Sequence, residues 1–232
     1  MINLAQNLGQ KFVNSVFSDV HTNYDKTNDL MSIFLHRKWK KDFVNMLNIQ
    51  KENRVLDLAS GTGDIVKLLL QKTNNIVASD INNDMLEIAK HKINSNFVDF
   101  IIADATKLPF EDAKFDCITC TFGIRNFEEI QKAIHEASRV LKSGGKFAIM
   151  EFMPNTQGYF FDKLYKIYIK NLLPKYDYIF KNKTSSYEYL SKSILQFQTR
   201  DNFVKMLELA EFEVVTPSFL NGGVGVFICT KK

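Results

Sequence analysis

The sequence is short of the features on which secreted and membrane-spanning proteins depend. Its 232 residues include only three cysteines and four prolines. No apolar run approaches the roughly 18 residues that a membrane-spanning helix requires. The N-terminal segment contains neither the apolar stretch of a signal peptide nor the arginine-rich pattern of a transit peptide. We therefore expect a cytoplasmic protein rather than a secreted or membrane-spanning one.

The few cysteines and histidines give little support for a metal or redox site. Cys117 and Cys120 match the spacing of a C-x-x-C motif, but they lie in an expected strand over residues 115–122. Residues three apart on a strand point to opposite faces, so we interpret both as small core side chains rather than a metal or redox pair. The four histidines are scattered, and none is paired at i, i+4 with an acidic motif, so we predict no metal site.

The excess of one sign of charge over the other is also small. The 30 lysines and arginines stand against 26 acids, which gives a net charge of +4 with lysine spread along the chain. This gives little support for a nucleic-acid partner. The content of 45% hydrophobic and 24% charged residues is ordinary for a globular protein, and the length suffices for a full core. Because no repeat, low-complexity run or linker interrupts the sequence, we predict a single domain over residues 1–232.

What the sequence does contain is one informative stretch, residues 54–64. An apolar run with Asp57 near its end breaks into a turn of small residues and restarts at Asp64 as an amphipathic helix. A strand, a tight loop and a helix N-terminus in this order are typical of a nucleotide-binding α/β unit. Gly61 and Gly63 allow the backbone to turn sharply and a ligand to approach it closely.

The same loop indicates which ligand to expect. A dinucleotide fingerprint requires a third glycine where this chain has Val66. Asp64 stands at the helix start, where it would repel a pyrophosphate. A carboxylate beside a cation instead gains about 1–4 kcal/mol at about 4 Å. The loop therefore predicts a cationic adenosine ligand without phosphate, and S-adenosylmethionine fits that description.

Strand-like and helix-like segments alternate after the first strand. Expected strands cover residues 54–59, 75–80, 98–103, 115–122 and 145–152, and expected helices cover 64–72, 84–94 and 128–141. Such alternation predicts a parallel sheet with right-handed crossovers and helices on both faces. Farther along, the pattern predicts helices near 186–197 and 201–210, then a hairpin of strands near 212–219 and 225–230.

Polar residues close three of these strands, at the edge where parallel sheets bind ligands. Asp80 ends the second strand, about where an acid would accept both ribose hydroxyls. Asp104 and Ala105 end the third, where a carboxylate can accept from an adenine amino group beside a small residue, and Thr121 ends the fourth. Each acid alone could equally be a helix N-cap. Their shared register with the glycine loop favours a binding site.

The segment before the first strand is expected to hold two helices, near residues 13–18 and 29–47. Residues 36–41 combine four cations with Trp39. They are either a solvated helix face that Trp39 anchors or part of a lid over the ligand site.

Residues 157–180 interleave aromatic residues with lysines. At helical spacing an apolar face forms, made of Phe161, Leu164, Tyr165, Tyr168 and Leu172. The segment is either a cap helix that packs on the sheet, or a face that lines a pocket for a large apolar substrate or rests on a bilayer.

A series of short motifs spans nearly the whole chain. They are Tyr24-Asp25, Asn28-Asp29-Leu30-Met31-Ser32, His36-Arg37-Lys38-Trp39-Lys40, the loop 57–64, Asp80-Ile81-Asn82, Leu108-Pro109-Phe110, Phe122-Gly123-Ile124-Arg125-Asn126 and Tyr187-x-Tyr189-Leu190-x-x-Ser193-Ile194. In these motifs the sequence resembles the ubiquinone/menaquinone-biosynthesis C-methyltransferases. Thr27, Phe34 and Gln198 depart from the usual family residues, mostly at the lid, which puts acceptor details rather than the cofactor site in doubt.

The resemblance implies a class I S-adenosylmethionine-dependent methyltransferase, a Rossmann-like α/β fold with a seven-stranded sheet whose last strand is antiparallel. It divides the chain into an N-terminal helical lid (1–50), a cofactor-binding core (51–152), a helical cap (153–200) and a C-terminal helix and hairpin (201–232). With the glycine loop, it implies that S-adenosylmethionine is bound by Gly61, Thr62, Gly63, Asp80, Asp104, Ala105 and Thr121.

The implied reaction is methyl transfer to a ring carbon of a polyprenylated quinol, either 2-polyprenyl-6-methoxy-1,4-benzoquinol or demethylmenaquinol or both. The ring carbon becomes nucleophilic when a neighbouring hydroxyl ionises. Arg125 is the expected catalytic residue: a guanidinium stays protonated, so it would stabilise the phenolate and orient a water that accepts the proton. His36, Tyr24 and Glu151 are alternative acid–base groups.

Other interpretations stay open. Arg125 could instead form a structural pair with Glu128 or Glu129. The chain could methylate another phenolic or lipid acceptor, or it could organise a quinone-synthesis complex without catalysis. The resemblance also leaves open a homodimer, a quinone-biosynthesis complex and a peripheral contact with the inner face of the membrane.

Overall fold

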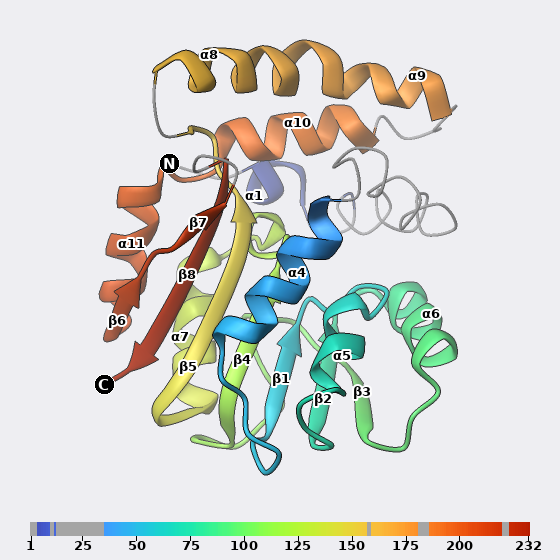
Figure 1. Ribbon diagram of the computed structural model, residues 1–232, viewed down its shortest axis with the longest axis vertical. Helices are drawn as coiled ribbons and strands as arrows, with labels where there is room; N and C mark the ends of the chain where they lie inside the picture. Colours follow the sequence, from blue (N-terminus) through green and yellow to red (C-terminus); the bar gives the residue numbers. More distant parts are fainter. Residues whose placement is uncertain (1–3, 10–11, 13–34, 157–158, 181–185, 220–222) are drawn as a thin grey trace.

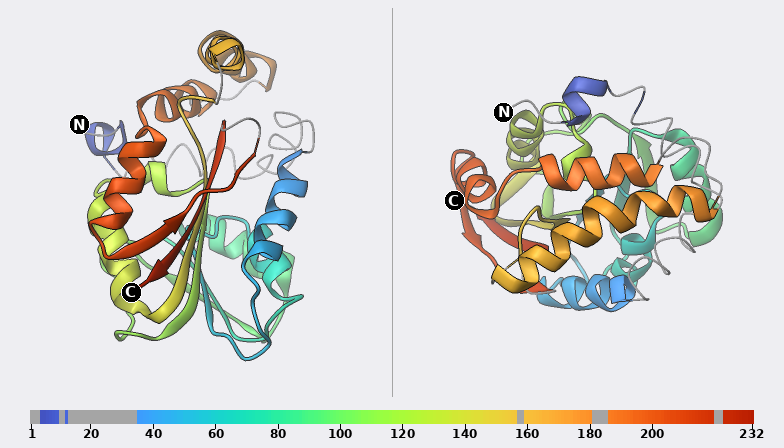
Figure 2. Two further views of the ribbon diagram at one scale, coloured as in Figure 1. Left: turned by 60° about the vertical axis from the view of Figure 1, so that its left-hand side comes forward. Right: turned by 90° about the horizontal axis from the view of Figure 1, so that it is seen from above.

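A mixed β-sheet with helices on both faces forms the body of the protein (Figures 1 and 2). The computed structural model describes residues 4–9, 12, 35–156, 159–180, 186–219 and 223–232. Its strands are β1 (Val55–Leu58), β2 (Ile76–Asp80), β3 (Val98–Ile102), β4 (Phe115–Thr121), β5 (Leu141–Phe152), β6 (Phe212–Val215), β7 (Ser218–Phe219) and β8 (Val224–Lys231).

The strand order is β3-β2-β1-β4-β5-β8-β6, with the two-residue β7 also paired to β8. The pairs among β1 to β5 are parallel, and β8 is inserted antiparallel between β5 and β6. The predicted α/β fold, with seven strands in one row and the last of them antiparallel, is therefore confirmed.

The helices follow the expected alternation with shifted ends. They are α1 (Leu4–Leu8), α4 (Leu35–Met46), α5 (Asp64–Leu69), α6 (Asn83–Ile93), the 3-10 turn η1 (Ile124–Asn126), α7 (Ile130–Val140), α8 (Tyr159–Ile167), the π turn η2 (Tyr168–Leu172), the 3-10 turn η3 (Leu173–Lys175), α9 (Tyr176–Phe180), α10 (Ser186–Gln196) and α11 (Arg200–Glu208). The predicted helix at 13–18 and the first part of the one at 29–47 lie outside the described residues.

The predicted continuous strand over 212–219 is wrong. The structure divides it into β6 and β7, with Pro217 between them. Proline has no N–H to donate to a ladder, and the Pro217 carbonyl instead accepts from the Val226 N–H at 3.2 Å. β6 and β7 pair separately with β8, and residues 221–222 of the expected turn lie outside the described residues.

The core has two layers, one on each face of the sheet. Along β5, Phe147 and Ile149 belong to one layer, whereas Ala148 and Met150 belong to the other. This is the period of two that a strand buried on both faces requires. Cys117 and Cys120 also lie in opposite layers, both buried and free. Their interpretation as core residues is confirmed.

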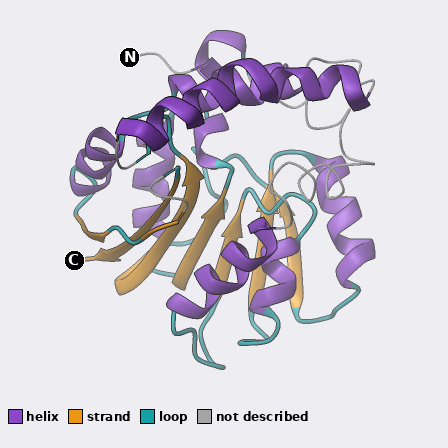
Figure 3. Ribbon diagram, turned by 45° about the horizontal axis from the view of Figure 1, so that its top comes forward, coloured by secondary structure: helices purple, strands orange, loops and turns teal. Residues whose placement is uncertain are grey.

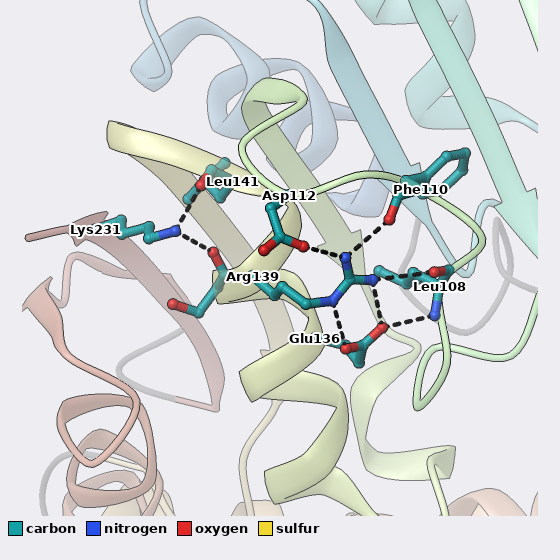
Figure 4. Close-up of polar contacts among 8 residues, drawn as sticks. Leu108, Phe110, Asp112, Glu136, Arg139, Leu141 and Lys231 are labelled. Carbon is teal, nitrogen blue, oxygen red and sulfur yellow. Dashed lines mark hydrogen bonds and ion pairs between the residues drawn. The ribbon is translucent and has the colours of Figure 1, made fainter.

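A network around Arg139 fixes the long connection between β3 and β4, which holds no helix (Figure 4). Arg139 donates to the carbonyl oxygens of Leu108 and Phe110 and pairs with Glu136 on α7. Glu136 in turn accepts from the Leu108 N–H at 2.8 Å. The Leu-Pro-Phe motif is thereby anchored to α7, which positions the strand end that carries Asp104.

A helical cap crosses the end of the sheet at which the parallel strands terminate (Figures 1 and 3). It consists of α10 and a long irregular helical run from α8 through η2 and η3 to α9, packed together through Ile169, Leu173, Tyr187 and Ile194. In the described ranges, every helix is too short or too polar to span a bilayer.

Candidate active site

A pocket opens at the carboxyl ends of β1 to β4, where the strand-end residues of the sequence analysis converge. Its lining includes Gly61, Asp80, Asp104, Ala105 and Thr121. The other lining residues are Leu58, Ala59, Ile81, Asn82, Met85, Ala103, Thr106, Phe122, Gly123, Asn126, Phe127, Glu128 and Glu129. Thr62, Gly63 and Arg125, which were also predicted, are not among the residues that line the pocket.

The glycine loop has the conformation that its composition predicts. Gly61 and Gly63 have φ angles of +53° and +82°, in the left-handed region that favours glycine. A Cβ added to Gly61 would have no atom within 4 Å. One added to Gly63 would lie 2.6 Å from the Ile93 side chain and 3.2 Å from Ala89, because Gly63 packs against α6. The two glycines therefore differ in their surroundings. Gly61 borders open space at the pocket, whereas Gly63 allows the loop to pack closely on α6.

Two alanine substitutions should separate these reasons. Each should cost about 1–2 kcal/mol of unfolding free energy for the left-handed backbone. Gly63→Ala should cost more, because α6 must also shift. Gly61→Ala should lower the affinity for the pocket ligand more than Gly63→Ala does, relative to its loss of stability. Urea unfolding and ligand titration of both variants would check this; equal effects on stability and binding would contradict it.

Asp80 connects the glycine loop to the next helix. Its carboxylate accepts from the N–H of Gly61 and from the N–H of Asn82, both at 2.9 Å. The N-cap of α6 is Asn82, whose side chain accepts from the Met85 N–H. Asp80 is therefore not the cap that the alternative interpretation assumed. Burial raises its pKa despite these backbone hydrogen bonds.

Asp104 lies on an exposed turn that follows β3, the strand next to the one that ends in Asp80. Its carboxylate accepts from the Thr106 N–H at 2.8 Å, and no helix begins there. This local turn leaves other acceptor positions of the carboxylate available to a ligand.

Asp57 is a buried acid directly beneath the glycine loop. It accepts from the Thr119 hydroxyl at 2.6 Å, and its second carboxylate oxygen has no hydrogen-bond partner. Burial raises the pKa of Asp57 to about 7, against the opposing effect of the Thr119 hydrogen bond. Asp57 therefore holds a proton over part of the physiological range, a property that its place in the motif did not reveal.

The structure corrects the role assigned to Asp64. Its carboxylate is paired with Lys40 of α4 and Lys92 of α6, both at 2.7 Å, and it does not line the pocket. Burial alone would raise the pKa of Asp64, but the two lysines hold it below the ordinary value. Flanked by two cations, Asp64 cannot be the acid that excludes phosphate.

The basic segment around Trp39 is a helix face that Trp39 anchors, as the first of the two interpretations predicted. Arg37, Lys38 and Lys41 are exposed, while His36, Trp39 and Lys40 are buried. Lys40 fixes α4 to α5 through Asp64, and no residue of α4 lines the pocket. The rest of the predicted lid lies mostly outside the described residues.

Arg125 is buried beside the pocket and held by a buried acid. It forms an ion pair with Glu151, donates to the Phe122 carbonyl at 2.6 Å and donates to the Ser193 hydroxyl at 3.3 Å. The expected structural partner was Glu128 or Glu129, and the structure gives Glu151 instead. Burial raises the pKa of Glu151, although Arg125 acts in the opposite direction.

Tyr189, in the Tyr-x-Tyr-Leu motif on α10 of the cap, contacts the η1 turn that also contains Arg125. The Tyr189 hydroxyl donates to the Asn126 side-chain oxygen at 2.9 Å, and Asn126 lines the pocket. Burial raises the pKa of Tyr189 to about 12, so its hydroxyl is protonated at neutral pH. The neighbouring Phe122 ring stacks on Phe152 with centroids 4.6 Å apart. The Tyr-x-Tyr-Leu motif therefore connects the cap to the pocket wall, a contact between residues 63 positions apart that the sequence pattern could not predict.

Comparisons with known proteins agree with this geometry. The model of the ubiE/COQ5 methyltransferase family matches residues 5–232. The ubiquinone/menaquinone biosynthesis C-methyltransferases UbiE of Rickettsia prowazekii and Rickettsia typhi are each 44% identical over 225 residues, covering 93% of this chain and 90% of the relative. The resemblance predicted from the motifs is confirmed.

Solved structures support the fold. A SAM-dependent methyltransferase from Thermotoga maritima superposes with a TM-score of 0.66 at 19% identity, covering 94% of this chain and 100% of that one. A SAM-dependent methyltransferase from Aquifex aeolicus superposes with a TM-score of 0.59 at 16% identity, covering 83% of this chain and 89% of that one. This chain belongs to the ubiE/COQ5 methyltransferase family, and it is an S-adenosylmethionine-dependent C-methyltransferase of the ubiquinone/menaquinone biosynthesis type.

Proposed function

We propose that S-adenosylmethionine binds in the pocket at the carboxyl ends of β1 to β4. One observation carries this assignment: among the described residues, the lining contains four acids and no lysine, arginine or histidine. The acids are Asp80, Asp104, Glu128 and Glu129. Such a lining repels a diphosphate and favours a cationic adenosine compound. The sequence predicted a cationic, phosphate-free ligand from Asp64. In the structure the four lining acids, rather than Asp64, favour such a ligand.

We assign the parts of the cofactor to the pocket as follows. Asp80 accepts from the ribose hydroxyls, and Asp104 with Ala105 receives the adenine. Gly61 lies against the methionine portion, and Thr62 and Gly63, which do not line the pocket, shape the loop that presents Gly61. Thr121 lies near the reacting end. The bound cofactor supplies an electrophilic methyl group. These roles rest on the convergence of the strand ends around one acidic pocket.

The acceptor is proposed to be a polyprenylated quinol, entering between the pocket and the cap. Phe122 and Phe127 offer apolar surface to its ring, and Asn126, oriented by Tyr189, offers a hydrogen-bonding side chain. Arg125 is ion-paired to Glu151, so much of its field is cancelled before it reaches a phenolate. Its contribution is then chiefly to hold the turn that presents Asn126, and its direct catalytic role stays a prediction.

An assay of the purified protein tests this function. Radiolabelled S-adenosylmethionine is supplied with a demethyl benzoquinol and, separately, with demethylmenaquinol, and the position of the methyl group in the product is determined. A label on the ring carbon supports the proposal. A label on oxygen, or transfer only to an unrelated phenol or lipid, would support the alternative acceptor class instead.

Cofactor affinity should rise with pH. Burial raises the pKa of Asp57 to about 7 and that of Asp80 above its ordinary value, so both bind protons more readily in the folded protein than in water. A cation in the pocket favours the ionised carboxylates, and protons compete with it. We expect affinity to increase about tenfold between about pH 5.5 and about pH 7.5.

Calorimetric titration across this range measures the effect. S-adenosylhomocysteine lacks the sulfonium charge and should show a weaker dependence. The variant Asp57→Asn should flatten the profile for S-adenosylmethionine. An affinity that falls with pH, or a profile that Asp57→Asn leaves unchanged, would contradict the assignment of these charges.

A further inference from the structure

The outer side of the run from α8 to α9 exposes apolar side chains. Leu164, Ile167 and Leu172 are 50%, 43% and 50% exposed, and Tyr178 is 93% exposed. They are four of the eleven large hydrophobic residues exposed in the described part of the chain. Their concentration in one helical segment distinguishes them from apolar residues scattered singly over a surface.

Lysines alternate with these apolar residues. The exposed lysines of the same segment are Lys163, Lys166, Lys170 and Lys175. We call these four lysines and the four apolar residues the cap face. Long basic side chains beside leucine and isoleucine are the composition of helices that lie in a membrane interface.

The two acids of this segment do not neutralise the cap face. Asp162 accepts from the Thr156 N–H at 3.0 Å and pairs with Lys166 at 2.7 Å. Asp177 accepts a hydrogen bond from the Tyr187 N–H at 3.0 Å, in the first turn of α10. The other three lysines of the cap face have no ion-pair partner among the described residues. The surface therefore carries a positive charge.

The cap face is not needed to attach the cap to the protein. The opposite side of the same helical run already packs on α10 through the fully buried Ile169 and Leu173. The Ser191 hydroxyl of α10 donates to the Ile169 carbonyl at 2.7 Å. The exposed leucines and isoleucine are thus not part of the contact that holds the cap together in the described molecule.

The position of this surface matters. The run from α8 to α9 is the outermost layer at the end of the molecule where the parallel strands terminate (Figures 1 and 2). The acidic pocket opens at the same end of the sheet. A flat surface resting on the cap face would therefore lie on the side from which an acceptor reaches the pocket.

We propose that the cap face docks on a bilayer containing anionic phospholipid. The three lysines without acidic partners attract the head groups, and the apolar residues enter the interface between head groups and acyl chains. This inference rests on the proposed function, because a polyprenylated acceptor resides in the bilayer and must reach the pocket from it.

Vesicle sedimentation with the full chain tests the proposal. Vesicles of phosphatidylcholine alone are compared with vesicles that also contain phosphatidylglycerol. Binding is expected with the anionic vesicles and should weaken as salt is added. The triple variant Lys163→Gln/Lys170→Gln/Lys175→Gln should lose roughly fivefold in partition coefficient for each lysine removed. Leu164→Ser/Ile167→Ser should lower binding to a similar extent.

Matched controls lie at the opposite end of the sheet. Lys51→Gln/Lys72→Gln and Phe97→Ser remove exposed residues of the same types near the amino ends of the strands. These variants should bind vesicles as the unmodified protein does. If they lose as much binding as the cap-face variants, the contact is not specific to the cap face and the proposal fails.

A second measurement separates this proposal from the proposed function. With a short-chain demethyl quinol in solution, the cap-face variants should keep full turnover, and with a long-chain quinol in anionic vesicles they should lose it. The proposal is overturned if the unmodified protein ignores anionic vesicles while it methylates the soluble quinol. It is also overturned if light scattering shows a dimer that Leu164→Ser/Ile167→Ser dissociates, because a second copy then covers the face.

Discussion

Replacing Asp80 by alanine is expected to lower the affinity for S-adenosylmethionine by about 10²-fold or more, since two hydrogen bonds to a charged group contribute about 1.5–3 kcal/mol each. Two losses combine in this variant. The ribose hydroxyls lose their proposed acceptor, and the N–H groups of Gly61 and Asn82 lose the carboxylate that fixes the glycine loop. Titration calorimetry would measure the affinity, and thermal unfolding would show how much of the change comes from the loop itself.

A matched control is available one strand away. Asp99 is an exposed acid near the start of β3, beside Val77 of β2, so Asp99→Ala removes a carboxylate from the neighbouring strand without touching the loop. It should leave both affinity and stability unchanged. If Asp80→Ala instead lowers the unfolding temperature but keeps the affinity, Asp80 is a structural brace only. Cells that depend on an Asp80→Ala protein and still make normal quinone would support the non-catalytic organiser.

Replacing Arg125 by alanine is expected to destabilise the protein by about 3–5 kcal/mol, the usual consequence of leaving a buried charge without its partner. Glu151 is fully buried and pairs with Arg125, and the Phe122 carbonyl and Ser193 hydroxyl would lose the same donor. Urea unfolding measures this loss. Turnover should fall with it, because the turn that carries Asn126 would no longer be held in place.

The double variant Arg125→Met/Glu151→Met separates the two roles of Arg125. It removes both charges together, so much of the lost stability should return. If Arg125 only positions the turn, turnover should recover in parallel with stability. If Arg125 stabilises the phenolate directly, the double variant should be stable, bind S-adenosylmethionine normally and remain inactive. A single variant that binds the cofactor and unfolds like the unmodified protein would contradict the structural role.

The sequence predicted the elements whose signals are local. The strand ends at Asp80, Asp104 and Thr121 follow short apolar runs, and the parallel topology then places them at one edge. Gly61 and Gly63 were also predictable, because a left-handed backbone favours glycine.

What the sequence could not predict are pairings between distant segments. Asp64 seemed to be a free acid because Lys40 and Lys92 lie 24 and 28 positions away, on two different helices. Glu151 lies 26 positions after Arg125, whereas the nearer Glu128 and Glu129 were the obvious partners by distance along the chain. The cap was likewise predicted as one apolar face, but the side that packs includes Ile169 and Leu173, and the π turn over Tyr168–Leu172 shifts the helical register between them.

The placement of β8 has a consequence for the order of folding. β8 lies between β5 and β6 in the sheet, although the whole cap separates β5 from β8 in sequence. The four strands β1 to β4 can assemble through short crossovers, and β6 can pair with β8 as a local hairpin. β8 reaches β5, however, only when the long segment that contains the cap is closed as a loop. The half of the sheet that holds the cofactor pocket is therefore positioned to form first, and the insertion of β8 is positioned to be the slow, rate-limiting event of maturation.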